Sequence, residues 1–196
     1  MKKIIYVLSL IIGTVAVTQA QVTYGFKAGG NLAKFTDNSD FEFKFGMHFG
    51  GVANIQLSDA FSLQPELLYS AQGYRQNFNG QKVRAKVDYF NIPILGSYQI
   101  TEGLELQFGP QIGINIRKEL EVDEQEGGSI FVNDIDASAA FGIKYFFDDY
   151  VFTQLRGTFG LTEVLTNSGY KNLVISLSLG VMLDSPIDEE NYEEMD

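Results

Sequence analysis

The chain has 196 residues, which is room for about one domain. It carries 14 basic and 25 acidic residues, and a formal net charge of −11 argues against a nucleic-acid partner because the composition offers no basic patch to meet phosphates. No cysteine is present, which excludes a disulfide framework and thiol chemistry.

Residues 1–20 predict a secretory signal peptide. Lys2 and Lys3 give a basic start, Ile4–Val17 is almost wholly apolar, and small residues precede a cleavage point after Ala20. The apolar run is shorter than the roughly 20 residues of a spanning helix, which favours cleavage over a membrane anchor. Removing the signal leaves 12 basic and 25 acidic residues and a single region, 21–183, followed by an acidic tail at 184–196.

The mature region reads as a series of amphipathic β-strands. In Leu104–Arg117 every even position is apolar or proline and every odd position is glycine, polar or charged, so one face is apolar and the other polar. Similar segments recur, each longer than the five or six residues common in soluble sheets. The eight predicted strands are Val22–Ala33, Phe43–Gln56, Ala60–Tyr74, Ala85–Ile100, Leu104–Lys118, Asp134–Phe147, Val151–Leu161 and Asn172–Leu183.

The connections between these strands alternate in length. Short turns at 57–59, 101–103 and 148–150 alternate with longer polar connections at 34–42, 75–84, 119–133 and 162–171. Outer-membrane barrels have short periplasmic turns and long outer loops. No apolar run after the signal approaches helix-spanning length, so a membrane protein must cross as a closed barrel. We therefore predict an all-β fold, an eight-stranded antiparallel up-and-down transmembrane β-barrel with both termini in the periplasm.

The apolar face is predicted to meet lipid. It carries essentially no charge in the strand centres, where a charge would cost about 2–4 kcal/mol. Glycines on the polar face suit a crowded interior, which favours this reading over a soluble lipocalin-like ligand carrier with an apolar pocket. Aromatic girdles are expected at both ends of the apolar face, with Tyr24, Phe61, Tyr98, Tyr145 and Phe147 near the short turns and Phe43, Phe45, Phe90 and Phe159 near the long loops.

Charged residues of both signs are predicted to point into the lumen. An eight-stranded barrel is only wide enough for its own side chains, and buried charges must pair. We expect a salt-bridged plug, with a small-solute channel as the alternative. The predicted lumen network comprises Lys27, Lys44, His48, Glu66, Glu105, Arg117, Asp136, Lys144 and Arg156, and Asp134 is expected to point inward as well.

The single histidine, His48, raises the alternative of a membrane enzyme. A catalytic base needs a nearby nucleophile and an orienting group, and a hydrogen-bonded lumen histidine is the favoured interpretation. The acidic residues in 119–133 match no calcium-loop spacing. We therefore expect no enzyme activity, no catalytic residue, no cofactor and no metal site.

The strand prolines, the 119–133 loop and the acidic tail each support a further prediction. Pro65, Pro93 and Pro110 lie within strands and predict bulges or local bends. The 119–133 loop is the longest outer segment and the first candidate for a protein contact. The tail at 184–196 has seven acidic residues and predicts a solvated periplasmic segment, with docking to a basic partner as the functional alternative.

Several motifs resemble those of the PorT-like outer-membrane β-barrel family. The motifs are Phe26-Lys27-Ala28-Gly29-Gly30-Asn31-Leu32, Leu63-Gln64-Pro65-Glu66-Leu67-Leu68-Tyr69-Ser70, Tyr89-Phe90-Asn91-Ile92-Pro93-Ile94-Leu95 and Gly109-Pro110-Gln111-Ile112-Gly113. The resemblance implies an OmpA-like eight-stranded barrel in the cell outer membrane, and the family's founding member is linked to protein secretion. We expect a non-enzymatic protein with a structural, adhesive or secretion-accessory role, with outer-membrane lipid as its first partner.

Overall fold

The computed structural model describes residues 21–36, 41–78, 81–122, 125–128, 132–165 and 168–183. The predicted signal peptide and the acidic tail lie outside these residues. Within them, no helix is long and apolar enough to cross a membrane.

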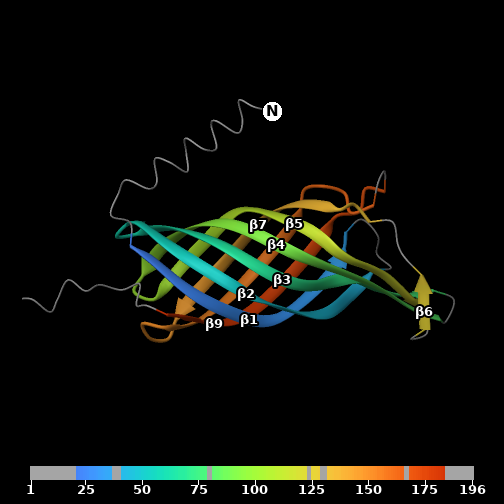
Figure 1. Cartoon of the computed structure of the whole chain (residues 1–196), viewed down its shortest axis with the longest axis horizontal. Helices are drawn as coiled ribbons and strands as arrows, with labels where there is room; N and C mark the ends of the chain where they lie inside the picture. Colours follow the sequence, from blue (N-terminus) through green and yellow to red (C-terminus); the bar gives the residue numbers. More distant parts are fainter. Residues whose placement is uncertain are drawn as a thin grey trace, which may run out of the picture.

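Eight long antiparallel strands close into a ring (Figure 1). Each of the eight long strands pairs with the next long strand in the chain, so that β4 pairs with β5 and β5 pairs with β7. The first strand, β1, pairs with the last, β9, and this pairing closes the cylinder. A ninth short strand, β6, pairs with the end of β5 and projects beyond the ring. The strands are β1 Val22–Phe35, β2 Glu42–Ser58, β3 Phe61–Phe78, β4 Gln81–Thr101, β5 Leu104–Val122, β6 Gln125–Gly128, β7 Ile135–Phe146, β8 Val151–Gly160 and β9 Asn172–Met182.

All eight predicted strands are present, and three of them, β3, β4 and β5, extend four residues further at the long-loop end than predicted. β3 and β4 continue as a paired hairpin through the predicted 75–84 loop, up to the pair Phe78 and Gln81. β5 continues to Val122, and β6 lies within the predicted 119–133 loop. These extensions project past the apolar belt, where charged residues replace apolar ones on the outward face. Charged and apolar residues still alternate in 82–87 and 119–122, but the apolar side chains Ala85, Val87 and Leu120 now pack inside.

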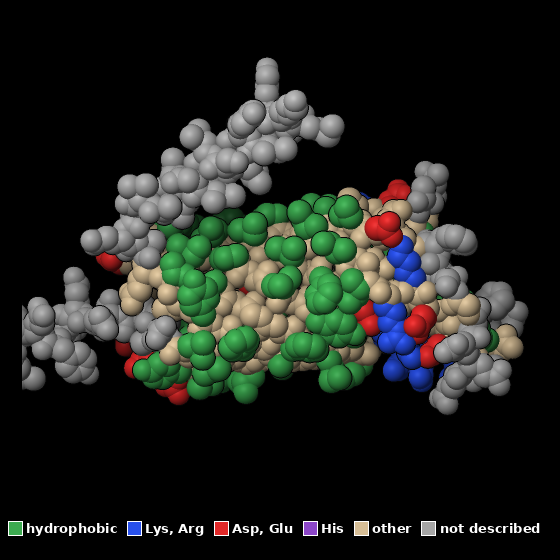
Figure 2. All heavy atoms as spheres, viewed as in Figure 1, with side chains coloured by type: hydrophobic (Ala, Val, Ile, Leu, Met, Phe, Trp, Pro, Cys, Tyr) green, Lys and Arg blue, Asp and Glu red, His purple; other side chains and the backbone are tan. Residues whose placement is uncertain are grey.

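The outer wall of the barrel is an apolar belt, as Figure 2 shows in green. Leu177, Leu179, Phe141 and Ile143 are all about half exposed, which is unusual for such side chains in a soluble protein. The polar set of the same strands is buried inside. This is the reverse of a soluble ligand carrier, so that alternative is wrong. At the short-turn end the belt carries Tyr24, Tyr98, Tyr145 and Phe147, and at the long-loop end Phe43, Phe45, Phe90 and Phe159.

The three strand prolines do not mark bulges. The β3–β4 register keeps the same offset on both sides of Pro65, and the β4–β5 register does so past Pro93 and Pro110. Register shifts occur elsewhere, including one between Asp88 and Tyr89. Proline lacks an N–H donor, and pairing is interrupted beside each of these residues without insertion of an extra residue.

Two glycines show how tightly the interior is packed. A Cβ atom on Gly29 would lie 1.9 Å from the carbonyl oxygen of Leu177 and 2.8 Å from Cε1 of His48. A Cβ atom on Gly180 would lie 2.2 Å from the ring of Phe152. Glycine at these positions lets neighbouring strands and large side chains share a narrow lumen.

Candidate functional site: the polar lumen

Glu66 lies at the centre of the lumen and accepts hydrogen bonds from two cations. Arg156 donates to both of its oxygens, with distances of 2.8 Å to Oε2 and 2.6 Å to Oε1. Lys27 Nζ donates to Oε2 at 2.8 Å. All three side chains are almost completely buried. The three strands β1, β3 and β8 thus meet at one carboxylate, and this geometry satisfies the paired hydrogen bonding that a buried ion pair requires.

Glutamine side chains extend this cluster toward the short-turn end. Lys27 also donates to Gln154 Oε1 at 2.6 Å, and Gln154 in turn donates to Gln107. Gln64 Nε2 donates to Glu66 Oε1 at 2.6 Å, and Gln64 Oε1 accepts from Lys144 Nζ at 2.9 Å. Sequence analysis did not single out the three glutamines, although each occupies a polar-face position.

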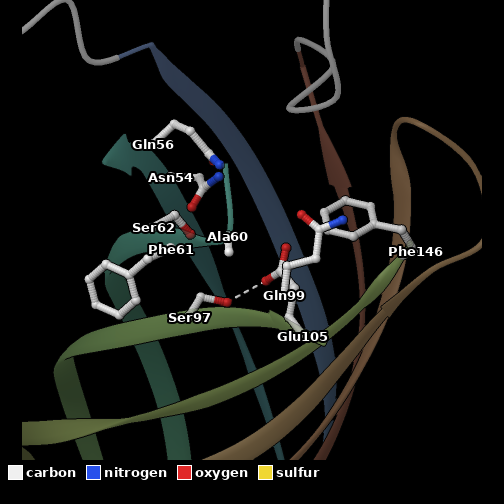
Figure 3. Close-up of a pocket in the computed structure, with 10 residues that line it drawn as sticks. Asn54, Gln56, Ala60, Phe61, Ser62, Ser97, Gln99, Glu105 and Phe146 are labelled. Atoms are coloured by element: carbon white, nitrogen blue, oxygen red, sulfur yellow. Dashed lines mark hydrogen bonds between the residues drawn. The ribbon is translucent and has the colours of Figure 1, made fainter. Parts of the chain in front are cut away.

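Lys144 and Glu105 form the ion pair nearest the short-turn end, with 3.3 Å between Nζ and Oε2. Glu105 also accepts a hydrogen bond from Ser97, drawn as a dashed line in Figure 3. The Lys144 ammonium lies 4.4 Å from the ring centroid of Phe146 and 5.0 Å from that of Phe152. Both the carboxylate and the two rings therefore stabilise a fully buried cation.

His48 is held between an amide and a hydroxyl. Its Nδ1 lies 2.6 Å from Oδ1 of Asn31, and its Nε2 lies 2.7 Å from Oγ of Ser178. This is the spatial order of a serine, histidine and orienting amide in a hydrolase. All three residues are buried in the lumen. Their contacts satisfy the ring nitrogens of a buried histidine, which is the structural role expected for it.

Lys44 and Asp136 are buried near the long-loop end, and neither forms an ion pair within the described part of the chain. Lys44 Nζ donates to the backbone carbonyl of Gln72 at 2.6 Å. Asp136 accepts hydrogen bonds from Ser138 Oγ at 2.6 Å and from Thr162 Oγ1 at 3.3 Å. Hydrogen bonds, rather than ion pairs, therefore satisfy these two buried charges.

Arg117 does not belong to the lumen, contrary to the prediction. Its side chain is 44% exposed, lies 3.8 Å from Asp88 and donates to Glu119 at 2.6 Å. The pairs Asp88–Arg117 and Tyr89–Asn115 leave Ile116 as an extra residue in β5, so a β-bulge turns the following residues to the other face. Asp134, also predicted inward, is exposed at the rim with 85% of its side chain accessible.

Apolar clusters close the described lumen at both ends. The outer cluster, at the long-loop end, packs residues from β1, β4 and the loops around the buried ring of Phe35. The short-turn cluster consists of Val52, Phe146, Phe152 and Met182. The outer cluster consists of Phe35, Phe41, Ala85, Val87, Tyr89, Val132 and Val164, with Tyr74, Leu120, Leu165 and Tyr170 packed against it.

Two small polar cavities remain in the described lumen. One of about 20 Å³ is lined by His48 and Arg156. The other, of about 30 Å³, lies at the short-turn end and is lined by Asn54, Ser62 and Glu105 (Figure 3). Each is large enough for one or two water molecules, and each adjoins a buried polar atom with no protein partner, Nε of Arg156 or Oδ1 of Asn54. Neither admits a solute or the acyl group of a lipid.

Buried ion pairs and hydrogen bonds therefore fill and close the lumen. Among the described residues, no group of three or more histidine, aspartate or glutamate side chains is arranged to hold a metal ion. The serine and histidine pair is buried, and the cavity that His48 lines is of water size.

Comparisons with known proteins agree with this architecture. A family model described as "Outer membrane protein beta-barrel domain" matches residues 18–166. Neisserial surface protein A is 14% identical, with a TM-score of 0.57, and the match covers 82% of this chain and 98% of that one. Ail, the attachment invasion locus protein of Yersinia pestis, is 10% identical, with a TM-score of 0.51, and the match covers 83% and 99%. No curated protein sequence matches the chain significantly.

Proposed function

The chain belongs to the outer membrane β-barrel domain family, and from this premise we propose that it is a closed, non-enzymatic barrel that presents its long-loop end at the cell surface. Its role is structural or adhesive. A secretion-accessory role, implied by the resemblance to PorT-like proteins, is a variant of the same proposal, because it also relies on contacts made by the rims and not on transport through the lumen.

The observation that carries this proposal is the sealed lumen. The Glu66 carboxylate joins Lys27 and Arg156 across the barrel, and the apolar clusters lie above and below this network. A solute would have to break buried charge-assisted hydrogen bonds, each of which is worth about 1.5–3 kcal/mol. The cavities of about 20 and 30 Å³ in the lumen are of water size.

An adhesive role is supported by the extensions at the long-loop end. β3, β4 and β5 continue beyond the apolar belt as paired strands, which offers an ordered surface for a partner. Ail is named for attachment and invasion, and it has also been solved with the heparin analogue sucrose octasulfate. A protein partner at this surface, or at the acidic tail 184–196, is part of the proposal.

Conductance measurements test the closed state directly. Purified protein inserted in a planar lipid bilayer is expected to show no steady conductance, with a known porin as the positive control. A steady conductance, abolished by removal of the protein, would overturn the plug and favour the small-solute channel.

Cysteine labelling tests the orientation, because the native chain contains no cysteine. Ser168→Cys, in the β8–β9 connection, is expected to react with a membrane-impermeant maleimide on intact cells. Asp149→Cys, in the β7–β8 turn, is expected to react only after the outer membrane is permeabilised. The reverse pattern would place the long-loop end in the periplasm.

N-terminal sequencing of the purified protein tests signal cleavage, with Gln21 as the expected first residue.

A further inference from the structure

The exposed cations of this acidic protein gather at one end. Among the described residues, every lysine and arginine outside the lumen lies at the long-loop end, although the composition alone predicts no basic patch. The short-turn end carries acidic residues only, Asp59, Glu102, Asp148 and Asp149. The cations at the long-loop end are Lys34, Arg75, Lys82, Arg84, Lys86, Arg117, Lys118 and Lys171.

Two of these cations face each other without a partner. Arg75 on β3 and Arg84 on β4 are directly opposite in the register, an arrangement that destabilises a bare sheet. Among the described residues neither guanidinium has a carboxylate within ion-pair distance. Glu121, the cross-strand neighbour of Arg84, is engaged by Lys86 instead. The pair therefore presents two guanidinium groups that form no close ion pair with any described residue, although Glu42 lies opposite Arg75 in the β2–β3 ladder and Glu121 lies opposite Arg84 in the β4–β5 ladder.

A pocket lies at this pair. It has a volume of about 190 Å³ and is lined by Arg75, Arg84 and Lys82, together with the amides Gln76 and Asn77. The one acidic residue in its lining is Glu42, which lies directly opposite Arg75 in the β2–β3 ladder. Guanidinium groups bind phosphate with two parallel hydrogen bonds, and the amide side chains add donors.

The pocket lies next to the region where lipid headgroups meet the barrel. On β4 the outward face runs from Phe90 in the apolar belt through Asp88, which is bound by Tyr69 on the outer wall, to Lys86 and then Arg84. Figure 2 shows Lys and Arg side chains, with Asp and Glu side chains among them, directly beyond the green belt at the long-loop end. Long basic side chains extend along such a boundary and place their charges at headgroup level.

We propose that Arg75 and Arg84, assisted by Lys82, bind the phosphate group of a phosphorylated lipid headgroup in the outer leaflet. The bound phosphate relieves the repulsion between the two guanidinium groups and anchors this side of the barrel to its surrounding lipid. The assignment rests on the proposed orientation, in which the long-loop end meets the outer leaflet.

The binding of lipid A to the detergent-solubilised full-length protein tests this site. Three probes are compared: diphosphorylated lipid A in micelles, chemically dephosphorylated lipid A in the same micelles, and inorganic phosphate. The phosphorylated lipid is expected to bind at least tenfold more tightly than the dephosphorylated one. Equal binding of the two lipids would overturn the proposal. Binding of inorganic phosphate as tight as that of the lipid would reassign the pocket to soluble phosphate and overturn the lipid assignment.

Matched variants separate a specific site from general attraction. Arg75→Gln combined with Arg84→Gln is expected to weaken lipid A binding by roughly tenfold to a hundredfold, because charge-assisted hydrogen bonds are lost. Lys34→Gln combined with Lys171→Gln removes the same charge elsewhere on the rim and is expected to change binding less than about twofold. Glu42→Gln is expected to tighten binding, since it removes the carboxylate from the pocket. An equal loss of lipid A binding in the two double variants would show unspecific electrostatic attraction and would overturn the proposed site.

The binding assay in detergent does not depend on how the protein sits in the cell. A failed binding experiment with correct cysteine labelling therefore counts against the phosphate site alone. Reversed labelling counts against the proposed orientation and function, whatever the affinity for lipid A. Heat-modifiable migration on gels confirms that each variant is folded, and the substituted residues are on the surface.

Discussion

Arg156 on β8 donates two hydrogen bonds to the carboxylate of Glu66 on β3, with distances of 2.8 and 2.6 Å, across the interior of the barrel. The two strands are not neighbours in the sheet. The ion pair therefore joins opposite walls of the barrel and holds the side chains of the lumen in one arrangement.

Glu66→Gln is expected to destabilise the barrel by about 3–5 kcal/mol, because it leaves Arg156 and Lys27 as buried cations without a counter-charge. Urea unfolding in detergent micelles measures the loss. Adding Lys27→Met to Glu66→Gln should recover part of it. Glu119→Gln, at the exposed rim, serves as the control and is expected to leave the unfolding midpoint unchanged. A Glu66→Gln variant as stable as the parent would contradict the role of the ion pair.

Gly29→Ala is expected to cost about 1–3 kcal/mol, because the new methyl group would overlap the backbone of Leu177 and the ring of His48. Gly51→Ala is the matched control, since the nearest atom to its Cβ is 4.0 Å away. The two unfolding midpoints are compared under the same conditions. A similar midpoint for both variants would show that the lumen has more room than the structure indicates.

Leu177→Lys is expected to cost about 2–4 kcal/mol, because this half-exposed side chain lies near the middle of β9 on the lipid-facing wall. Leu183→Lys, at the short-turn edge of the same wall, should cost only about 0–1 kcal/mol. Unfolding in lipid vesicles measures both. Tolerance of lysine at Leu177 in vesicles would mean that this wall does not face hydrocarbon.

Ser178 is expected to remain unmodified by a fluorophosphonate probe, despite its 2.7 Å contact with His48 Nε2. The probe needs space beside Oγ, and the neighbouring cavity has room for water only. Mass spectrometry of the labelled protein detects the adduct, with a serine hydrolase as the positive control. An adduct on Ser178 that disappears in His48→Ala would restore the enzyme hypothesis.

The β7–β8 turn is expected to weaken in acid. The backbone N–H groups of Val151 and Tyr150 donate to Asp148 and lower the pKa of its carboxyl below the ordinary value. A lowered folded-state pKa gives stability above the unfolded pKa of about 3.9, which is lost as the pH falls through the folded value. Melting temperatures of the parent chain and Asp148→Asn, measured from pH 6 downward, should converge below about pH 4. Parallel curves of melting temperature against pH for the two proteins would show that Asp148 does not cause the loss of stability in acid.

The alternation of apolar and polar residues was sufficient to predict the strands, the closed ring and the direction of most side chains, because lipid and lumen impose opposite polarity on successive residues. It failed at Arg117, where the extra residue Ile116 reverses the faces without any signal in local composition. It also failed at the ends of β3, β4 and β5, because the outward face becomes charged once the strands leave the apolar belt and the apolar side chains there, such as Val87 and Leu120, pack inside.

The partners within the lumen were beyond prediction for a different reason. Glu66 meets Lys27 and Arg156 because their strands lie at particular positions around the ring and at a particular stagger. No local spacing encodes that stagger, since it depends on the register of every ladder between them. The contact between Ser178 and His48 is of the same kind.

The cylinder closes only where β1 meets β9, in a ladder that runs from Gly25 and Met182 to Phe35 and Asn172. One edge of the N-terminal strand, β1, pairs with β2, but the other edge therefore has no partner until the last strand has been synthesised. Any partly made chain would expose two open edges able to pair with other copies. Assembly must accordingly wait for a complete polypeptide, and a truncation that removes β9 should yield aggregate and not a smaller barrel.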